Sequence, residues 1–396
     1  MIIFLTVFID LVGFGIVIPL LPYYAETAPF NATPFEVGIL FASYSLMQFI
    51  FSPVLGSLSD KYGRRPVLFF SIIGSAVGYL FIGLAFALWM VFVGRIVSGI
   101  TGGNISTAQA YIADVTTKET RAKGMGLFGA MFGLGFIFGP VIGGILSRYG
   151  IHVPFLFAAV LSLVNAVLVY LFLPETVKKD SVQTSEYNKN RLIELIESLK
   201  DAQFGTLNAI CFFLVTSFSI MTYAFVLYTM ERFAYTPEQN GYIFMFIGVI
   251  AIVFQGGLFA RLALRFGENA LMIIGCLIMA TSLFAIPYIG PASGGLLALL
   301  VATAMLAIGN SMASPATTSL VSKVSDEAQQ GKALGVMQSG ASLARAIGPA
   351  LGGVLLNNSL NHVDNFTIQR TFWTASAIMI IAALISFFSR SLHSEI

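Results

Sequence analysis

The chain has 396 residues, of which 57% are hydrophobic and only 10% are charged, and its formal net charge is +2. Soluble domains carry about 25% charged residues, so this composition excludes a soluble protein and indicates a polytopic membrane protein. The small net charge gives no indication of a nucleic-acid partner, and none is expected.

Twelve apolar segments are long enough to cross a bilayer as helices, which takes about 20 residues each. The predicted fold is therefore an all-α membrane protein with twelve transmembrane helices. The short break between the third and fourth segments rests on the Ala87–Trp89 region. In chain order the segments lie near 2–22, 36–57, 67–86, 88–112, 124–147, 153–173, 205–230, 239–260, 270–289, 294–316, 332–356 and 370–389.

Basic residues are concentrated in the loops on one side of these segments. Sixteen of the 21 Lys and Arg residues fall on the side of Lys61, whereas Arg148, Arg232 and Arg370 fall on the other side. Cytoplasmic loops carry such an excess. We therefore expect the loop of Lys61 and both termini to be cytoplasmic.

One long polar stretch divides the segments six and six. It predicts an N-terminal six-helix bundle over 1–174, a cytoplasmic linker over 175–203 and a C-terminal six-helix bundle over 204–396. Leu192 and Ile196 of the linker are at helical spacing, which indicates an amphipathic helix. This helix lies either on the membrane surface or against cytoplasmic loops.

Two segments that lie 209 residues apart repeat one pattern. GLFGAMFGLGFIFGPVIGG at 126–144 and GVMQSGASLARAIGPALGG at 335–353 share Gly-Pro-x-x-Gly-Gly in one register. The two halves are therefore copies, which is typical of transporters whose substrate binds between them. Proline bends a helix, so we expect bends that let the halves pack tightly and seal the pathway, or else bends with no gating role. The residues concerned are Gly139, Pro140, Gly348 and Pro349.

Residues with catalytic or metal-binding chemistry are scarce. Cys211 and Cys276 both fall in apolar segments, so a disulfide is not expected, and His152, His362 and His393 have no metal-ligand spacing. No nucleophile–base set is visible either. The sequence predicts no metal, no cofactor and no enzyme.

Three motifs resemble signatures of the major facilitator superfamily. They are GSLSDKYGRRP at 56–66, RIVSG at 95–99 and GFIFGPVIGG at 135–144, and residues 8–22 and 43–74 are most similar to its tetracycline/proton antiporter branch. The resemblance implies a secondary active transporter that works by alternating access. It implies proton-coupled efflux of small amphiphilic organic compounds, multidrug or tetracycline-like, from a bacterial inner membrane. The expected partners are this substrate, protons and the lipid bilayer, and the protein is expected to be a monomer.

The sequence departs from that branch at two acidic positions. Its antiporters carry acids in the third and ninth helices, where Gly78 and Ala280 stand here, so only Asp10 of the first segment remains. This departure keeps an alternative open. The protein would then transport organic anions or metabolites, by uptake or by facilitated diffusion, without drug/proton exchange. A non-transporting receptor on the same fold is disfavoured because the loop and Gly-Pro signatures are intact.

The charged loop at 56–66 is interpreted as a cytoplasmic latch. Asp60 is suited to cap the N-terminus of the span near Gly331–Gly335, and Arg64 is suited to reach Asp114. The alternative is a topology signal with solvated charges. The predicted latch residues are Gly56, Asp60, Gly63, Arg64, Asp114 and Arg121.

Ionisable groups inside the spans are costly and usually functional. Asp10 is the predicted proton carrier, because burial disfavours its charged form; the alternative is a structural acid. Arg95 is suited to pair with Asp10 or to bind an anionic group, and the alternative is a purely structural role. Arg345 is suited to attract a carboxylate or to brace backbone carbonyls. The predicted substrate cavity comprises Gln48, Arg95, Asn104, Tyr223, Tyr228, Asn310, Gln338 and Arg345.

Overall fold

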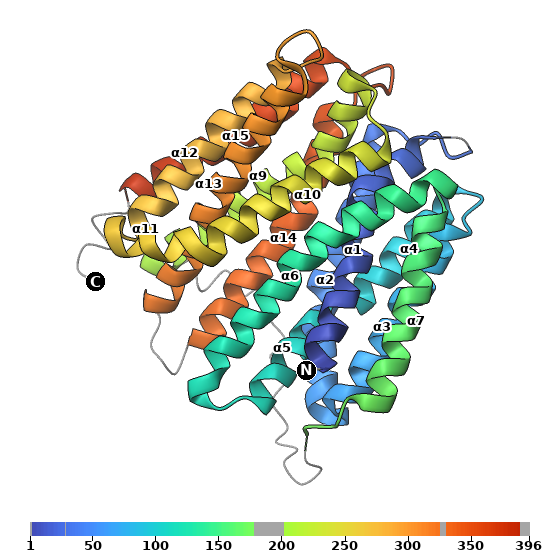
Figure 1. The fold of residues 1–396 in the computed structure, drawn as a ribbon, viewed down its shortest axis with the longest axis vertical. Coiled ribbons are helices and arrows are strands. Elements are labelled where there is room, and N and C mark those ends of the chain that lie inside the picture. Colours follow the sequence, from blue (N-terminus) through green and yellow to red (C-terminus); the bar gives the residue numbers. More distant parts are fainter. Residues whose placement is uncertain (1, 28, 178–201, 325–329, 389–396) are drawn as a thin grey trace. The chain divides into compact units, whose positions relative to one another are not determined.

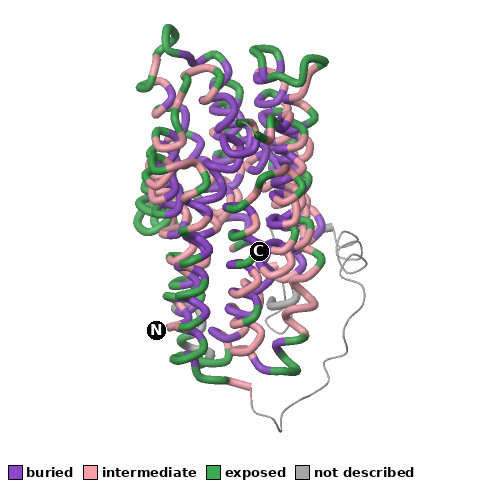
Figure 2. The backbone as a smooth tube through the Cα atoms, turned by 90° about the vertical axis from the view of Figure 1, so that its right-hand side faces the viewer, coloured by how far each residue is buried: buried purple, intermediate pink, exposed green. Residues whose placement is uncertain are grey.

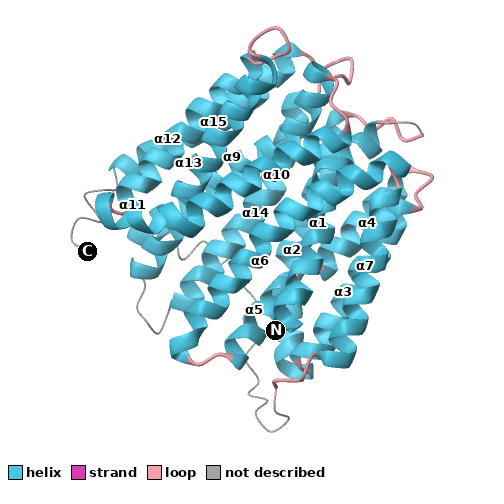
Figure 3. Ribbon diagram, in the orientation of Figure 1, coloured by secondary structure: helices cyan, strands magenta, loops and turns pink. Residues whose placement is uncertain are grey.

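The computed structural model describes residues 2–27, 29–177, 202–324 and 330–388. In these ranges the long elements are helices (Figure 3), and twelve helical segments are long and apolar enough to cross a membrane. The predicted twelve-helix membrane fold is confirmed. The amphipathic helix expected around Leu192 lies outside the described residues, so the predicted division at 175–203 stays a prediction.

The helices of the first half follow one another closely (Figure 1). Their bounds are α1 Ile2–Glu26, α2 Pro34–Tyr62, α3 Arg64–Gly83, α4 Leu88–Thr101, α5 Asn104–Val115, α6 Lys118–Leu146, η1 Ser147–Tyr149 and α7 Val153–Phe172. In the second half they are α9 Ala202–Phe233, α10 Pro237–Val253, η3 Phe254–Leu258, α11 Phe259–Phe266, α12 Glu268–Ala285, η4 Ile286–Tyr288, α13 Gly295–Val324, α14 Gln330–Leu356 and α15 Asn365–Phe388.

The chain forms two compact units, each with its own apolar core. Figure 2 marks the buried residues along the helices in purple. The first unit comprises Met1–Asn188 and Tyr235–Met245, and the second comprises Lys189–Ala234 and Phe246–Ile396. Side chains from α1, α3, α5, α6 and α7 build the first core. The second core is built mainly from α9, α12, α13 and α14. The start of α10 thus belongs to the first unit.

Glycine allows a close helix contact in the first unit, where α1 runs along α6 (Figure 1). A Cβ atom on Gly15 would lie 2.7 Å from the Gly135 carbonyl oxygen, and one on Gly139 would lie 2.6 Å from the Cα atom of Gly15. The second unit repeats this contact between α14 and α9, where a Cβ on Gly348 would lie 2.8 Å from the Thr216 carbonyl oxygen. Each Gly-Pro motif therefore packs on the first helix of its own unit, and its predicted sealing role stays a prediction.

The fourth span is broken at Gly102–Gly103, whereas the sequence predicted one helix over 88–112. A Cβ on Gly103 would lie 2.8 Å from the Cα atom of Ser52, so the paired glycines let α2 approach the break. The Gly102 carbonyl oxygen accepts a hydrogen bond of 2.9 Å from Gln48 Nε2. The break makes Asn104 the first residue of α5.

The eighth span is also less regular than the single helix predicted over 239–260. Between α10 and α11, the residues Phe254–Leu258 form a π-helical turn. This turn contains Gly256 and Gly257, and glycine weakens a regular helix because it has the largest backbone freedom to lose. Gln255 Nε2 of this turn donates to Ser311 Oγ of α13 at 3.4 Å.

We expect Gly15→Ala to destabilise the protein by about 1–3 kcal/mol, because the added methyl group overpacks the α1–α6 contact. Gly126→Ala is the matched control, since a Cβ there would meet no atom within 4 Å. The measurement is thermal unfolding in detergent, which is monitored through the reaction of the buried Cys276 thiol with a maleimide dye as the protein unfolds. Equal unfolding temperatures for the two variants would contradict the close packing.

Candidate functional site

Asp10 and Asn104 form the centre of the candidate site. Asp10 lies within α1 and is partly buried, and Asn104 is 4% exposed at the start of α5. Asn104 Nδ2 donates to Asp10 Oδ2 at 3.4 Å. The break in the fourth span therefore places an amide beside the membrane acid.

Arg95 has partners other than the predicted Asp10. Its Nε donates to the Leu40 carbonyl oxygen at 3.2 Å, and its guanidinium carbon lies 4.5 Å from the centre of the Tyr44 ring. The side chain is only 2% exposed. A buried cation needs such compensation, and the carbonyl and the ring face supply it.

Gln48 lies between Tyr44, which contacts Arg95, and the helix break at Gly102–Gly103. Its Nε2 lies 2.9 Å from the Gly102 carbonyl oxygen and 3.4 Å from Tyr44 Oη. Four of the predicted site residues thus lie in one polar region of the first unit, formed by α1, α2, α4 and α5. They are Asp10, Gln48, Arg95 and Asn104.

This region holds buried polar atoms that have no hydrogen-bond partner among the described residues. They are Thr6 Oγ1, Ser98 Oγ, Asn104 Oδ1 and Thr107 Oγ1, and Asn165 Oδ1 of α7 likewise has no such partner. Each such atom costs about 1–3 kcal/mol if it stays unpaired. The sequence analysis missed the two threonines, because a hydroxyl in a helix usually bonds a carbonyl of its own helix.

The predicted tyrosines of the second unit lie in packed surroundings. Tyr223 and Tyr228 are fully buried. Tyr228 Oη donates to the Ile289 carbonyl oxygen at 2.7 Å, and its ring centre lies 5.6 Å from that of Phe372. A Cβ on Gly352 would lie 2.8 Å from the Tyr223 ring. Both phenols therefore contribute to helix packing.

The other predicted cavity residues of the second unit are less buried. Gln338 is exposed on α14, and Asn310 and Arg345 are partly buried on α13 and α14. Arg345 Nη2 donates to Ser342 Oγ at 2.9 Å. Gln338 and Arg345 are seven residues apart, so they share one face of α14.

Arg64 is the centre of the charged loop between α2 and α3. Its Nε donates to Asp114 Oδ2 at 3.0 Å, and its Nη1 donates to Ser59 Oγ at 2.7 Å and pairs with Asp60. The side chain is 11% exposed. The chain reverses at Gly63, whose φ of +107° suits glycine. Arg64 thus ties α2 to the end of α5.

Glu175 was missed by the sequence analysis. Its carboxylate accepts the backbone N–H groups of Arg64 and Arg65 at 2.9 and 3.0 Å. It thereby caps the N-terminus of α3, where unpaired N–H groups attract an anion. The only sequence signal is an acid directly after Pro174, at the end of the sixth span.

Three predicted latch features have other outcomes. Gly56 does not set a close helix contact, because a Cβ there would lie 3.8 Å from Ser106 Oγ. The side chain of Arg121 is outside the described residues. Asp60 pairs with Arg64, and its capping of the span near Gly331–Gly335 stays a prediction.

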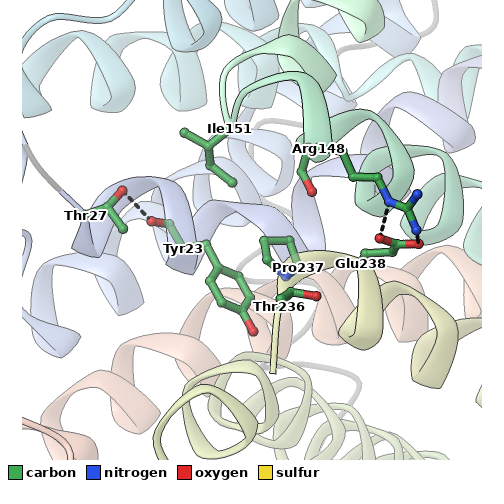
Figure 4. Close-up of a pocket in the computed structure, with 8 residues that line it drawn as sticks. Tyr23, Thr27, Arg148, Ile151, Thr236, Pro237 and Glu238 are labelled. Atoms are coloured by element: carbon green, nitrogen blue, oxygen red, sulfur yellow. Dashed lines mark hydrogen bonds and ion pairs between the residues drawn. The ribbon is translucent and has the colours of Figure 1, made fainter. Parts of the chain in front are cut away.

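A pocket of about 410 Å³ lies at the opposite end of the first unit (Figure 4). Beside it, Arg148 Nε and Nη2 donate to the two carboxylate oxygens of Glu238, each at 2.5 Å. The lining residues are Tyr23, Thr27, Ser147, Arg148, Ile151, Thr236, Pro237 and Glu238.

Tyr23 makes a second connection at this end. Its hydroxyl donates to the Tyr235 carbonyl oxygen at 2.5 Å and accepts from Asn240 Nδ2 at 2.7 Å. We call Tyr23, Arg148, Glu238 and Asn240 the α10 clasp, since they tie the start of α10 to α1 and η1. The sequence analysis noted Arg148 only as a basic residue on the sparsely charged side.

Within the described ranges no group of three or more His, Cys, Asp or Glu side chains is arranged to hold a metal ion.

The Arg64–Asp114 pair is expected to show a coupling free energy of about 1 kcal/mol in a double-mutant cycle. The variants are Arg64→Ala and Asp114→Ala, singly and together, compared by unfolding in mixed micelles with increasing dodecyl sulfate. Arg64→Lys is the control, because lysine keeps the charge but lacks the planar fork that reaches several acceptors. Strictly additive effects would show that the pair is solvated.

Tyr23→Phe should destabilise the protein more than Arg148→Gln. The first change removes the buried hydroxyl that donates to the Tyr235 carbonyl oxygen and accepts from the Asn240 amide, which costs about 1–3 kcal/mol. The second removes a pair whose arginine is 65% exposed and solvent-screened. Thermal unfolding in detergent ranks the two, and the reverse order would contradict this account of the clasp.

Comparison with known proteins finds one family model and several similar transport and resistance proteins. The family model described as Major Facilitator Superfamily matches residues 3–304 and 258–395. The chain is 33% identical over 392 residues to the tetracycline resistance protein, class H, of Pasteurella multocida, covering 97% of this chain and 94% of that protein. It is 29% identical over 363 residues to multidrug resistance protein 2 of Bacillus subtilis (strain 168), covering 90% of this chain and 88% of that protein.

Solved structures share the fold at lower sequence identity. The human organic anion transporter MFSD10 (TETRAN) has a TM-score of 0.72 and 23% identity, covering 97% of this chain and 98% of that one. The nucleoside transporter NupG has a TM-score of 0.78 and 13% identity, covering 98% and 97%.

Proposed function

Since the chain belongs to the Major Facilitator Superfamily, we propose that it exports small amphiphilic organic compounds in exchange for protons by alternating access. Membership of the family makes the protein a multi-pass membrane transporter of small molecules and not an enzyme. The substrate class is supported by relatives that are named for resistance to tetracycline or to multiple drugs.

The environment of Asp10 is the main support for the proposed proton coupling. It is an acid within a membrane-spanning helix, and its side chain accepts a hydrogen bond from the neutral amide of Asn104. Arg95 is instead engaged by Leu40 and Tyr44. A membrane carboxyl without a cationic partner is more easily neutralised by a proton than one in an ion pair.

Gly78 and Ala280 support a scheme with a single acid. A Cβ on Gly78 would lie 2.7 Å from the Gly94 carbonyl oxygen of α4, so the packed helices have no room for a carboxylate there. Ala280 is 3% exposed in the core of the second unit. We therefore assign proton coupling to Asp10 alone.

We further propose a monomer in the bacterial inner membrane, with both termini in the cytoplasm. The excess of Lys and Arg on the side of the loop 56–66 supports this orientation. The bacterial sources of the similar resistance proteins support the location.

Asp10→Asn is expected to abolish uptake of tetracycline or ethidium driven by a pH gradient in proteoliposomes, because asparagine does not carry the exchanged proton. Exchange of labelled for unlabelled substrate, which needs no net proton movement, is expected to persist. Asp364→Asn is the matched control, since it makes the same change in an exposed acid outside the spans. Wild-type gradient-driven transport in Asp10→Asn would refute the assignment.

An organic-anion transporter is the second candidate, and Arg345 favours it. Its guanidinium shares a face of α14 with Gln338 and bonds Ser342, so this face combines a cation with polar groups suited to a carboxylate. The same proteoliposomes discriminate the candidates. Anion uptake that is insensitive to the pH gradient and lost in Arg345→Gln, but kept in Arg345→Lys, would replace the proton-exchange proposal.

A further inference from the structure

Buried polar residues continue from Asp10 towards the charged-loop end of the first unit. Thr6 lies one turn before Asp10 on α1, and Thr107 lies one turn after Asn104 on α5. Asn165 lies on the neighbouring α7. All three are at most 3% exposed.

These residues lie in one part of the bundle. Asn165 Nδ2 donates to the Thr6 carbonyl oxygen at 3.0 Å. Thr6 shares a face of α1 with Asp10, and Thr107 shares a face of α5 with Asn104, so the hydrogen bond between Asn104 and Asp10 brings these two faces together. Three helices thus bring polar groups to a common interior.

The polar atoms of this interior are not paired with one another. Among the described residues, the hydroxyls of Thr6 and Thr107 and the amide oxygens of Asn104 and Asn165 have no hydrogen-bond partner. Buried polar groups are almost always hydrogen-bonded to protein or water. Ordered water that makes two to four hydrogen bonds is the usual partner where protein groups do not reach.

We propose that Thr6, Asn104, Thr107 and Asn165 hold ordered water beside Asp10, and that this water carries the proton between Asp10 and the charged-loop end. The inference rests on the proposed function, because it requires that Asp10 exchanges a proton. The proton leaves the Asp10 carboxyl for a water oxygen, which passes one of its own protons to the next acceptor. A threonine hydroxyl serves such a chain because it both donates and accepts.

The α5 face supplies the route to the surface. Tyr111 lies one turn beyond Thr107, and its hydroxyl donates to the Pro174 carbonyl oxygen at 3.1 Å. Asp114 follows on the same face and meets the charged loop through Arg64. The α5 residues therefore run from the membrane acid to a surface carboxylate.

One titratable group on another helix interacts with Asp10, and a charged group interacts in turn with that one. Tyr79 of α3 lies within electrostatic range of Asp10, and Arg95 of α4 lies within range of Tyr79. Neither belongs to the route, because both lie on the α3–α4 side. Variants of Thr107 therefore leave the charges around Asp10 unchanged.

The test follows the proton at Asp10 without a substrate. Infrared absorption of the protonated Asp10 carboxyl, assigned by its loss in Asp10→Asn, is recorded after a pH jump in detergent. Thr107→Val is expected to slow the protonation or deprotonation of Asp10 about tenfold, because it removes a hydroxyl that binds water while keeping the size of the side chain. Thr107→Ser keeps the hydroxyl and should exchange at the wild-type rate.

Thr317→Val is the matched control. It removes an equally buried threonine hydroxyl, which bonds the Ala313 carbonyl oxygen of its own helix at 2.8 Å in the second unit. Its exchange rate should equal that of the wild type. Thr6→Val provides the same test from α1 should Thr107→Val fail to fold.

The outcomes separate the two proposals. An Asp10 band that titrates at the wild-type rate in Thr107→Val and Thr6→Val overturns the route and leaves the proton carrier intact. A wild-type protein with no Asp10 band between about pH 5 and 9 overturns the proton carrier and, with it, the route.

Discussion

Backbone hydrogen bonding inside the bilayer is the constraint on which the candidate site depends. A spanning segment has to satisfy its N–H and C=O groups within the protein, so a broken helix needs outside partners. At Gly102–Gly103 the amide of Gln48 is such a partner for the freed carbonyl. The glycines allow α2 to come close enough for that bond. The same break starts α5 at Asn104, which reaches Asp10.

The two units share a packing scheme but differ in their polar content. In both, a Gly-Pro-x-x-Gly-Gly helix packs on the first helix of the unit through glycines that leave no room for a side chain. The first unit adds Asp10 and the engaged Arg95. The second adds Arg345 on a polar face of α14. Under the proposed function, proton exchange belongs to the first unit, whereas Arg345 of the second unit supports the alternative of an organic-anion transporter.

At both ends of the first unit, charged side chains bind helix ends or pair with one another. At one end Glu175 caps α3 while Arg64 binds Asp114. At the other end Glu238 receives Arg148, and Tyr23 holds the start of α10 through Asn240. The buried hydroxyl contacts have the larger energetic weight, because exposed ion pairs are screened by solvent.

The twelve spans, the repeat, the charge asymmetry and the lone acid Asp10 were determined by the sequence, because hydropathy and charge are properties of consecutive residues. Only the tertiary structure decided which groups these polar and charged side chains bind. Glu175 is 111 residues from the backbone N–H that it caps, and Arg148 is 90 residues from Glu238. It also gave Arg95 a carbonyl and a ring in place of Asp10. Such pairings depend on which helix faces meet, and a linear pattern does not encode that without the packing of the whole bundle.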